Sequence, residues 1–306
     1  MAKAKKLKKV IGNNVPKGSL PKETGPVVEI DNNHSKDNHR QRILIGTPCT
    51  GLVRVEWVSA RFSQIIPTNW SQSDCWQFMS SYMPLAYQLP DAENLIAKAV
   101  VEGDFEWLLF IESDNVIPQN TFRKINEYMI SKKWPVVGGL YFTKSSPPEP
   151  MIYRGLGTGY FDDWKFGDKV QCDGLPFGCT LIHGNLIREL WKDSPEYVVN
   201  GTLTRRVFET MDSVWQDPIT GAYLNKSGTS DLNFYHRLID GGYLARAGFP
   251  EHQKMEFPFL VDTTIFVKHV DNNGIQWPID IPKKYEPAPE RLAEVAAEFG
   301  LAPRNI

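Results

Sequence analysis

Two carboxylates, Glu112 and Asp114, stand one residue apart directly after the apolar run Trp107–Ile111. Where a strand gives way to a turn, side chains with this spacing can face one cavity, and carboxylate oxygens are ligands that Mg²⁺ and Mn²⁺ favour. Such an incomplete site leaves room for phosphate oxygens, and the metal would neutralise the charge of a departing diphosphate. We therefore expect Glu112-Ser113-Asp114 to hold the diphosphate of a nucleotide donor. The alternative is an acidic pair that only ends a strand in a solvated loop.

The run before this tripeptide predicts the kind of sheet that positions it. Trp107–Ile111 is apolar on both faces, as in a central parallel strand that helices cover on each side. Strand and helix patterns alternate around it, which predicts an α/β fold: an αβα sandwich with a mainly parallel central sheet, whose ligands lie beyond the carboxyl ends of the strands. The other segments of this pattern are expected strands at Arg42–Ile45 and Pro135–Leu140 and expected helices at Val53–Ile66, Asp91–Gly103 and Asn120–Ser131.

Helical periodicity predicts which face of the first helix is buried. Apolar residues recur three or four positions apart at Val55, Val58, Phe62 and Ile65. This stripe is typical of a helix face that packs on a core.

The remaining segments have weaker signals. The polar stretch Ser194–Gly228 reads as a loop that could include a mobile lid. A capping residue, Thr229 or Ser230, predicts a helix that ends at Gly241-Gly242. Further expected elements are strands around Trp76–Met79 and at Val170–Gly174, Phe177–Ile182, Leu244–Ala247 and Phe259–Val267, and helices at Asn185–Trp191 and Glu290–Phe299.

Length, composition and charge limit the class of protein. The 306 residues are 42% hydrophobic, which is enough for a sizeable core. A formal net charge of -2 excludes the overall basic field of a dedicated nucleic-acid binder. The four cysteines lack Cys-x-x-Cys spacing, which favours reduced thiols over a zinc site or a disulfide framework. No segment approaches the ~18 apolar residues of a membrane span, so the expected location is the cytoplasm.

The segment Trp107–Pro118, with the helix Asp91–Gly103 before it and Val136–Phe142 after it, resembles the core of GT-A glycosyltransferases. These sequence blocks are most similar to those of the family 2-like group, which includes many bacterial and phage enzymes. The resemblance implies a Rossmann-like GT-A fold and metal-dependent transfer of a sugar from a UDP- or GDP-sugar to an acceptor hydroxyl. In that family the strand ends in Asp-x-Asp, whose last Asp ligates Mn²⁺ or Mg²⁺. The match makes Asp114 the ligand and places Glu112, one methylene longer, in the first position.

The resemblance assigns chemistry to two more side chains. Ser230-Asp231 matches the helix start at which inverting members carry their base, so Asp231 would take the proton of the acceptor hydroxyl. The alternative is that Asp231 only stabilises the first turn of its helix. His269 follows an apolar strand, where many relatives place a second metal ligand, and His183 is a weaker candidate for that position. A lone histidine is more often a hydrogen-bonded structural residue.

Four more residues are expected to line the donor site. Thr47 and Pro48 match the first-strand loop that borders the base and ribose in the family. Gly178, in Phe177-Gly178-Cys179-Thr180, resembles a small-residue strand that approaches the sugar, where a missing side chain allows close contact. Tyr141 follows a strand that should end beside the donor, so its ring could stack on a base or sugar.

The resemblance divides the chain into three regions. Residues 1–40 are polar, start with a basic run and predict a flexible tail, residues 41–282 form the GT-A catalytic domain, and residues 283–306 form a helical extension. The tail is either a solubilising arm or an electrostatic attachment to an anionic acceptor. The acceptor could be a glycan or a hydroxymethylated DNA base.

Two other functions compete with glycosyl transfer. A sugar-nucleotide nucleotidylyltransferase has a related sheet but needs a Gly-rich basic loop after its first strand. Here no Lys or Arg follows that strand until Arg54. A catalytically inactive protein that binds a nucleotide sugar or a glycan is the other alternative, and such a binder would have no need of a base at Asp231.

Overall fold

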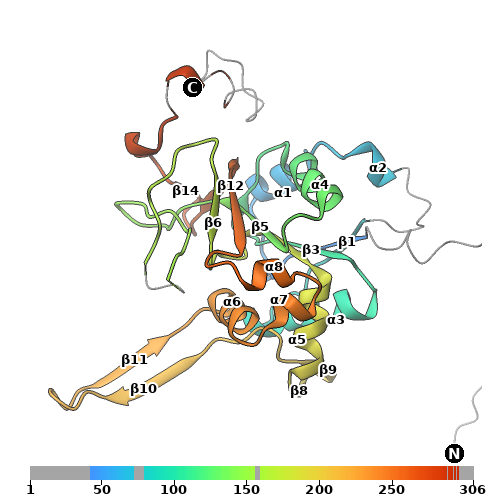
Figure 1. Cartoon of the computed structure of the whole chain (residues 1–306), viewed down its shortest axis with the longest axis vertical. Coiled ribbons are helices and arrows are strands. Elements are labelled where there is room, and N and C mark those ends of the chain that lie inside the picture. Colours follow the sequence, from blue (N-terminus) through green and yellow to red (C-terminus); the bar gives the residue numbers. More distant parts are fainter. Residues whose placement is uncertain are drawn as a thin grey trace, which may run out of the picture. The chain divides into compact units, whose positions relative to one another are not determined.

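A seven-stranded sheet in the order β2-β1-β3-β7-β5-β12-β6 forms the centre of this computed structural model (Figure 1). The structure describes residues 42–71, 79–155, 159–287, 289–291, 293 and 295. β7 and β6 run opposite to the other five strands, so the sheet is mixed but mainly parallel. The strands are β1 (Ile43–Gly46), β2 (Met79–Tyr82), β3 (Trp107–Ile111), β5 (Val136–Leu140), β6 (Lys169–Cys172), β7 (Cys179–His183) and β12 (Phe259–Phe266).

Helices cover both faces of this sheet. On β3, Leu108 and Phe110 point into a core shared with α3, α5 and α6, whereas Trp107 and Leu109 point into a second core shared with α1 and α4. This alternation confirms the predicted αβα sandwich and is consistent with a Rossmann-like GT-A fold. The helices are α1 (Val55–Phe62), α2 (Thr68–Ser71), α3 (Leu89–Glu102), α4 (Thr121–Ser131), α5 (Gly184–Asp193), α6 (Ser230–Asp240), α7 (Tyr243–Arg246) and α8 (Pro250–Gln253).

A small three-stranded sheet lies at the carboxyl end of β3. It pairs β4 (Asn115–Val116) with β13 (Lys268–Val270), and β13 with β14 (Gln276–Trp277), all antiparallel. β4 is too short to show any periodicity in the sequence. The pairing of β4 with β13 therefore holds the segment that follows Asp114 beside the segment that follows β12.

Helix α1 buries the face opposite to the predicted one. Val55 and Phe62 are each 76% exposed, whereas Trp57 is 4% exposed. Two stripes of this helix fit the helical period, and the side with Trp57 packs on the sheet because the indole buries a large apolar area while its N–H finds a partner. The predicted buried set was Val55, Val58, Phe62 and Ile65, and the observed one is Trp57, Ala60 and Arg61.

Two other predictions in the second half of the chain are wrong. The stretch Ser194–Gly228 contains two β-hairpins, and Figure 1 shows the second of them extending away from the central sheet. The first hairpin has a sequence signal in its turn, because Asn200-Gly201 joins the two strands with positive φ at both residues, 45° and 80°, as a two-residue hairpin turn requires. The polar composition of the rest of the stretch instead favoured a loop. The expected strand Leu244–Ala247 is instead helix α7, because a short apolar run fits either element. The hairpins are β8 (Glu196–Val199) with β9 (Thr202–Arg205) and β10 (Asp212–Gln216) with β11 (Tyr223–Ser227).

Three predictions fall wholly or partly outside the described residues. The tail at residues 1–40 lies outside them, as does most of the segment around Trp76, where β2 begins only at Met79. Most of the expected helix Glu290–Phe299 also lies outside, and two 3₁₀ turns precede or overlap its start: η2 (Lys283–Tyr285) and η3 (Pro289–Arg291). Among the described helices, none combines the length and apolar character needed to cross a bilayer.

Candidate active site

The acidic tripeptide and the first-strand loop leave the sheet at the same edge. β1 and β3 are parallel neighbours with Gly46 opposite Phe110, so Thr47 and Glu112 both follow at their carboxyl ends. Thr47 and Pro48 are buried there, and the Thr47 N–H donates to the Tyr82 carbonyl at 3.0 Å. Parallel sheets place ligands beyond this edge.

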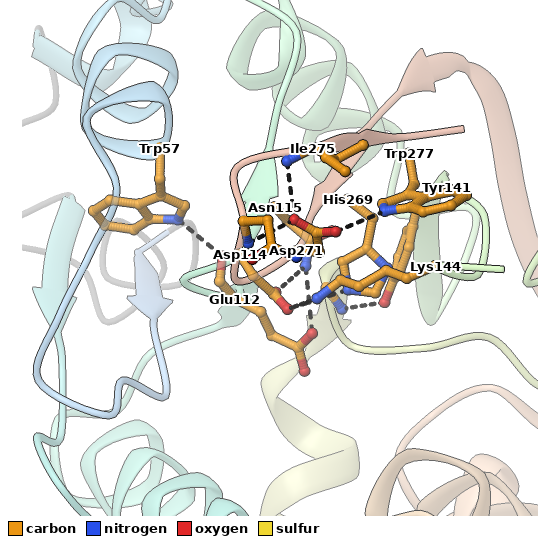
Figure 2. Close-up of polar contacts among 12 residues, drawn as sticks. Trp57, Glu112, Asp114, Asn115, Tyr141, Lys144, His269, Asp271, Ile275 and Trp277 are labelled. Carbon is orange, nitrogen blue, oxygen red and sulfur yellow. Dashed lines mark hydrogen bonds and ion pairs between the residues drawn. The ribbon is translucent and has the colours of Figure 1, made fainter. Parts of the chain in front are cut away.

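The β4–β13 pairing brings His269 to Asp114. Asn115 lies opposite His269 in the register, and the Val270 N–H donates to the Asp114 carbonyl at 2.7 Å. As a result, Nε2 of His269 lies 3.2 Å from Oδ2 of Asp114, although 155 residues separate them (Figure 2). The pair that was predicted as metal ligands therefore lies in direct contact. The roles themselves stay predictions.

The hydrogen bond of the other ring nitrogen of His269 indicates which nitrogen carries a hydrogen. Nδ1 lies 3.2 Å from the Phe142 carbonyl oxygen, which can only accept, so Nδ1 carries a hydrogen. If the ring is neutral, Nε2 has no hydrogen, so its lone pair faces Oδ2 of Asp114, which is also an acceptor. This arrangement needs a cation or a proton between the two atoms, so it suits either a metal ion or an imidazolium.

Lys144 contacts the same carboxylate. Its Nζ lies 2.6 Å from Oδ2 of Asp114, and Figure 2 shows the ammonium group directed into the cluster. Burial alone would raise the pKa of Asp114, but the hydrogen bonds and charges of His269 and Lys144 outweigh burial and lower it. Asp114 is therefore held ionised.

Glu112 is fixed at its backbone and surrounded by negative charge. Its carbonyl accepts from the Trp57 indole at 2.8 Å, and its N–H donates to the Gly178 carbonyl at 3.1 Å. Its carboxylate accepts a longer contact, 3.3 Å, from the Asn115 amide. Desolvation, followed by the charges of Asp114 and Asp231, raises the pKa of Glu112 to about 8.

The space beside the Gly178 Cα is filled by the side chains of Tyr141 and Asn115. A Cβ there would lie 2.4 Å from Oη of Tyr141 and 2.6 Å from Nδ2 of Asn115, so a larger residue would displace both. The Gly178 N–H donates to Tyr141 Oη at 2.8 Å. Tyr141 is 2% exposed and packs edge-on against His269, with 5.4 Å between ring centroids. Both residues thus shape the floor of the site. Their predicted contact with the donor stays a prediction.

Asp231 lies in the first turn of helix α6. Its Oδ1 accepts from the Leu232 N–H at 2.7 Å and contacts the Thr229 hydroxyl. Desolvation raises the pKa of Asp231 above its ordinary value, although these hydrogen bonds lower it. The negative charge of Asp231 in turn raises the pKa of both Glu112 and Tyr141, which places Asp231 within electrostatic range of the tripeptide.

His183, the weaker candidate for a ligand, lies at the other edge of the sheet. It pairs with Trp107, the first residue of β3, and its Nδ1 accepts from the Asn185 N–H at 3.2 Å at the start of α5. Burial lowers the pKa of His183 to about 3, so the ring is a neutral structural group.

Asn115 and Lys144 belong to the cluster but were not predicted. The buried Oδ1 of Asn115 has no hydrogen-bond partner among the described residues, while its amide nitrogen contacts Asp114 at 3.1 Å. The position of Asn115 directly after the tripeptide was a usable signal, whereas nothing in the sequence points to Lys144. Within the described part of the chain, no three His, Cys, Asp or Glu side chains form a group able to hold a metal, so a cation at Asp114 and His269 would need further oxygen ligands.

No family model and no curated protein matches this sequence. Among solved structures, A197 from STIV is 14% identical over 76% of this chain and 86% of its own, with a TM-score of 0.44. TarS 1-349 from S. aureus in complex with UDP is 11% identical, with a TM-score of 0.31, over 50% of each chain. The same protein in complex with UDP-GlcNAc is 12% identical with a TM-score of 0.32, over 50% of this chain and 48% of its own.

Proposed function

We propose that this chain is a glycosyltransferase that uses a nucleotide-sugar donor and a divalent cation. The observation that carries the proposal is the convergence of Asp114 and His269 on one another at the carboxyl edge of the sheet, 3.2 Å apart, with Asp231 in electrostatic range. A metal-ligand pair beside a separate carboxylate is what this reaction requires. The metal ion on the ligand pair would hold the leaving diphosphate, and the separate carboxylate would accept a proton.

The residues present fit a divalent cation. Asp114 Oδ2 and His269 Nε2 would hold it, because they are two acceptors that face each other when the ring is neutral. Next to Asp114, the buried Oδ1 of Asn115 has no hydrogen-bond partner among the described residues, and an unsatisfied buried oxygen often marks the place of a missing ligand or water. When bound, Mn²⁺ or Mg²⁺ would neutralise charge on the diphosphate and orient it.

The protein groups divide the remaining work. Asp231 would accept the proton of the acceptor hydroxyl as that oxygen attacks the anomeric carbon, opposite the departing diphosphate, which inverts the configuration. Burial suits this role because the raised pKa makes the carboxylate a stronger base. Thr47 and Pro48 would border the base and ribose of a UDP- or GDP-sugar. The acceptor would be a glycan hydroxyl or a hydroxymethylated DNA base.

A panel of nucleotide sugars tests the proposal. Each would be added to the chain with and without Mn²⁺ while thermal unfolding is followed, because a ligand that binds only the folded state raises its stability. We expect one UDP- or GDP-sugar to stabilise the protein in the presence of Mn²⁺, and free nucleoside diphosphate to appear slowly on incubation. Stabilisation without any release of diphosphate, whatever acceptor is offered, would point instead to an inactive binder. No stabilisation by any donor would contradict the proposal.

A further inference from the structure

Lys144 contacts the carboxylate oxygen that also faces His269. Nζ of Lys144 lies 2.6 Å from Oδ2 of Asp114, and Nε2 of His269 lies 3.2 Å from the same oxygen. Figure 2 shows the ammonium group and the imidazole converging on Asp114. The donor-free protein therefore already carries a cation at the carboxylate to which the proposed function assigns a metal ion.

The loop around Lys144 is held by its own hydrogen bonds. The Thr143 N–H donates to the Glu149 carbonyl at 2.9 Å, and the Glu149 N–H donates to Thr143 Oγ1 at 3.0 Å. Oγ1 of Thr143 also lies 2.6 Å from Oγ of Ser145. Lys144 lies within this loop, but its side chain is 30% exposed and has a flexible stem of four carbons. The ammonium group can thus leave Asp114 without any rearrangement of the backbone.

We infer that Lys144 competes with a divalent cation for Asp114 in the donor-free protein and moves to the donor's diphosphate when the donor binds. The inference rests on the proposed function, because it assumes that Asp114 holds a metal. Two cations on one carboxylate oxygen repel each other, so the metal and Lys144 cannot both be well bound there. A diphosphate offers Lys144 another anion close by.

This exchange couples the two ligands. A diphosphate that draws Lys144 away leaves Asp114 free for the metal, and a metal that displaces Lys144 leaves the ammonium free for the diphosphate. Coupling of this kind is reciprocal, so each ligand must tighten the binding of the other by the same factor. Lys144 would thus keep the metal weakly bound until a nucleotide is present.

Calorimetric titration of Mn²⁺ alone into the full chain tests the competition without any need for turnover. We expect Lys144→Gln to bind Mn²⁺ about tenfold more tightly than the wild type, a factor that allows for solvent screening of two partly exposed groups. Lys144→Arg keeps the charge and should retain the wild-type affinity. With saturating UDP or GDP present, the gain in Mn²⁺ affinity caused by the nucleotide should be smaller in Lys144→Gln than in the wild type.

Lys132→Gln is the matched control. Lys132 is 44% exposed and its Nζ pairs with Glu106 at 2.8 Å, so the change removes an ion-paired lysine elsewhere and should leave Mn²⁺ binding unaltered. Equal Mn²⁺ affinity in the wild type and Lys144→Gln would overturn the inference and leave the proposed function intact. If neither protein binds Mn²⁺ with or without nucleotide, the inference and the metal-dependent function both fail.

Discussion

Asp231 is the side chain whose assigned role depends most on its surroundings. A carboxylate in the first turn of a helix is common and needs no catalytic explanation. Here desolvation raises its pKa, and its negative charge raises the pKa of both Glu112 and Tyr141. A raised pKa is a property that a general base requires, and the same carboxylate can also stabilise the start of its helix.

Replacement of Asp231 by Asn should therefore affect turnover more than donor binding. We expect the rate of transfer to fall by about 10²- to 10⁴-fold, the usual contribution of a general base. In the wild type the rate should fall as the pH drops through a pKa above the ordinary value of 3.8, because the base must be ionised and burial raises its pKa. The pH dependence of kcat with a fixed donor checks this. A profile that keeps the same acid limb in Asp231→Asn would show that another group is the base.

Gly178 is predicted to be intolerant of even one methyl group. In Gly178→Ala the new Cβ would lie 2.4 Å from Tyr141 Oη, so that ring and Asn115 must shift. Overpacking of this kind costs about 1–3 kcal/mol, which urea unfolding can measure. Gly228→Ala is the control, because its Cβ would meet no atom closer than 3.5 Å. Equal unfolding free energies for the two variants would show that the floor of the site is loosely packed.

Among the elements, helix α3 supports the start of α6 through a buried carboxyl group. Glu93 is 1% exposed, and its Oε1 accepts from the Ser230 hydroxyl at 3.0 Å. Among the described residues its Oε2 has no hydrogen-bond partner. Desolvation is the main cause that raises the pKa of Glu93 well above 4.5, and the nearby charges of Glu112 and Asp231 add to it, while the Ser230 hydrogen bond lowers it.

The free energy of unfolding should therefore fall as the pH rises, because Glu93 must ionise while it is buried. A pKa that is higher in the folded than in the unfolded state contributes stability below the unfolded value, and this stability is lost as the pH rises toward the folded value. We expect Glu93→Gln to flatten this pH dependence and to be more stable than the wild type at alkaline pH, as measured by urea unfolding across a pH series. Glu102→Gln, at the exposed end of the same helix, is the control. A variant with the wild-type slope would exclude Glu93 as its source.

The sequence predicted some elements well because one physical signal dominated them. Trp107–Ile111 is apolar on both faces and directly follows a well-marked helix, as expected for a central covered strand, and β3 is that strand. Helix α1 had two competing stripes, and periodicity alone could not choose between Phe62 and Trp57. The hairpins in Ser194–Gly228 pair their strands with one another and add no strand to the central sheet, so they have no long apolar run. The Asn200-Gly201 turn was a usable signal for the first of them.

At the scale of the whole described sheet, strand order explains why distant segments meet. β3, β7, β5 and β12 are consecutive in the sheet, so the chain after β3, after β5 and after β12 reaches one edge, together with the start of β7. Glu112 and Asp114 could be predicted because their position at a strand end is local. The contact of Lys144 with Asp114 could not, because it joins residues 30 positions apart that follow two different strands of the sheet. The contacts of Asn115 with Glu112 and Asp114 are local, so its position next to the tripeptide was a usable signal.

The most direct test of the account is calorimetric titration of the nucleotide sugar that responds in the panel, with and without Mn²⁺, into the wild type and Asp114→Asn. The account predicts Mn²⁺-dependent binding to the wild type and a loss of about 100-fold or more, about 2.7 kcal/mol, in the variant. Asp104→Asn, which changes an aspartate with a 79% exposed side chain, should bind as the wild type does. Unaltered Mn²⁺-dependent binding to Asp114→Asn would contradict the central claim that this carboxylate holds the metal and, through it, the diphosphate.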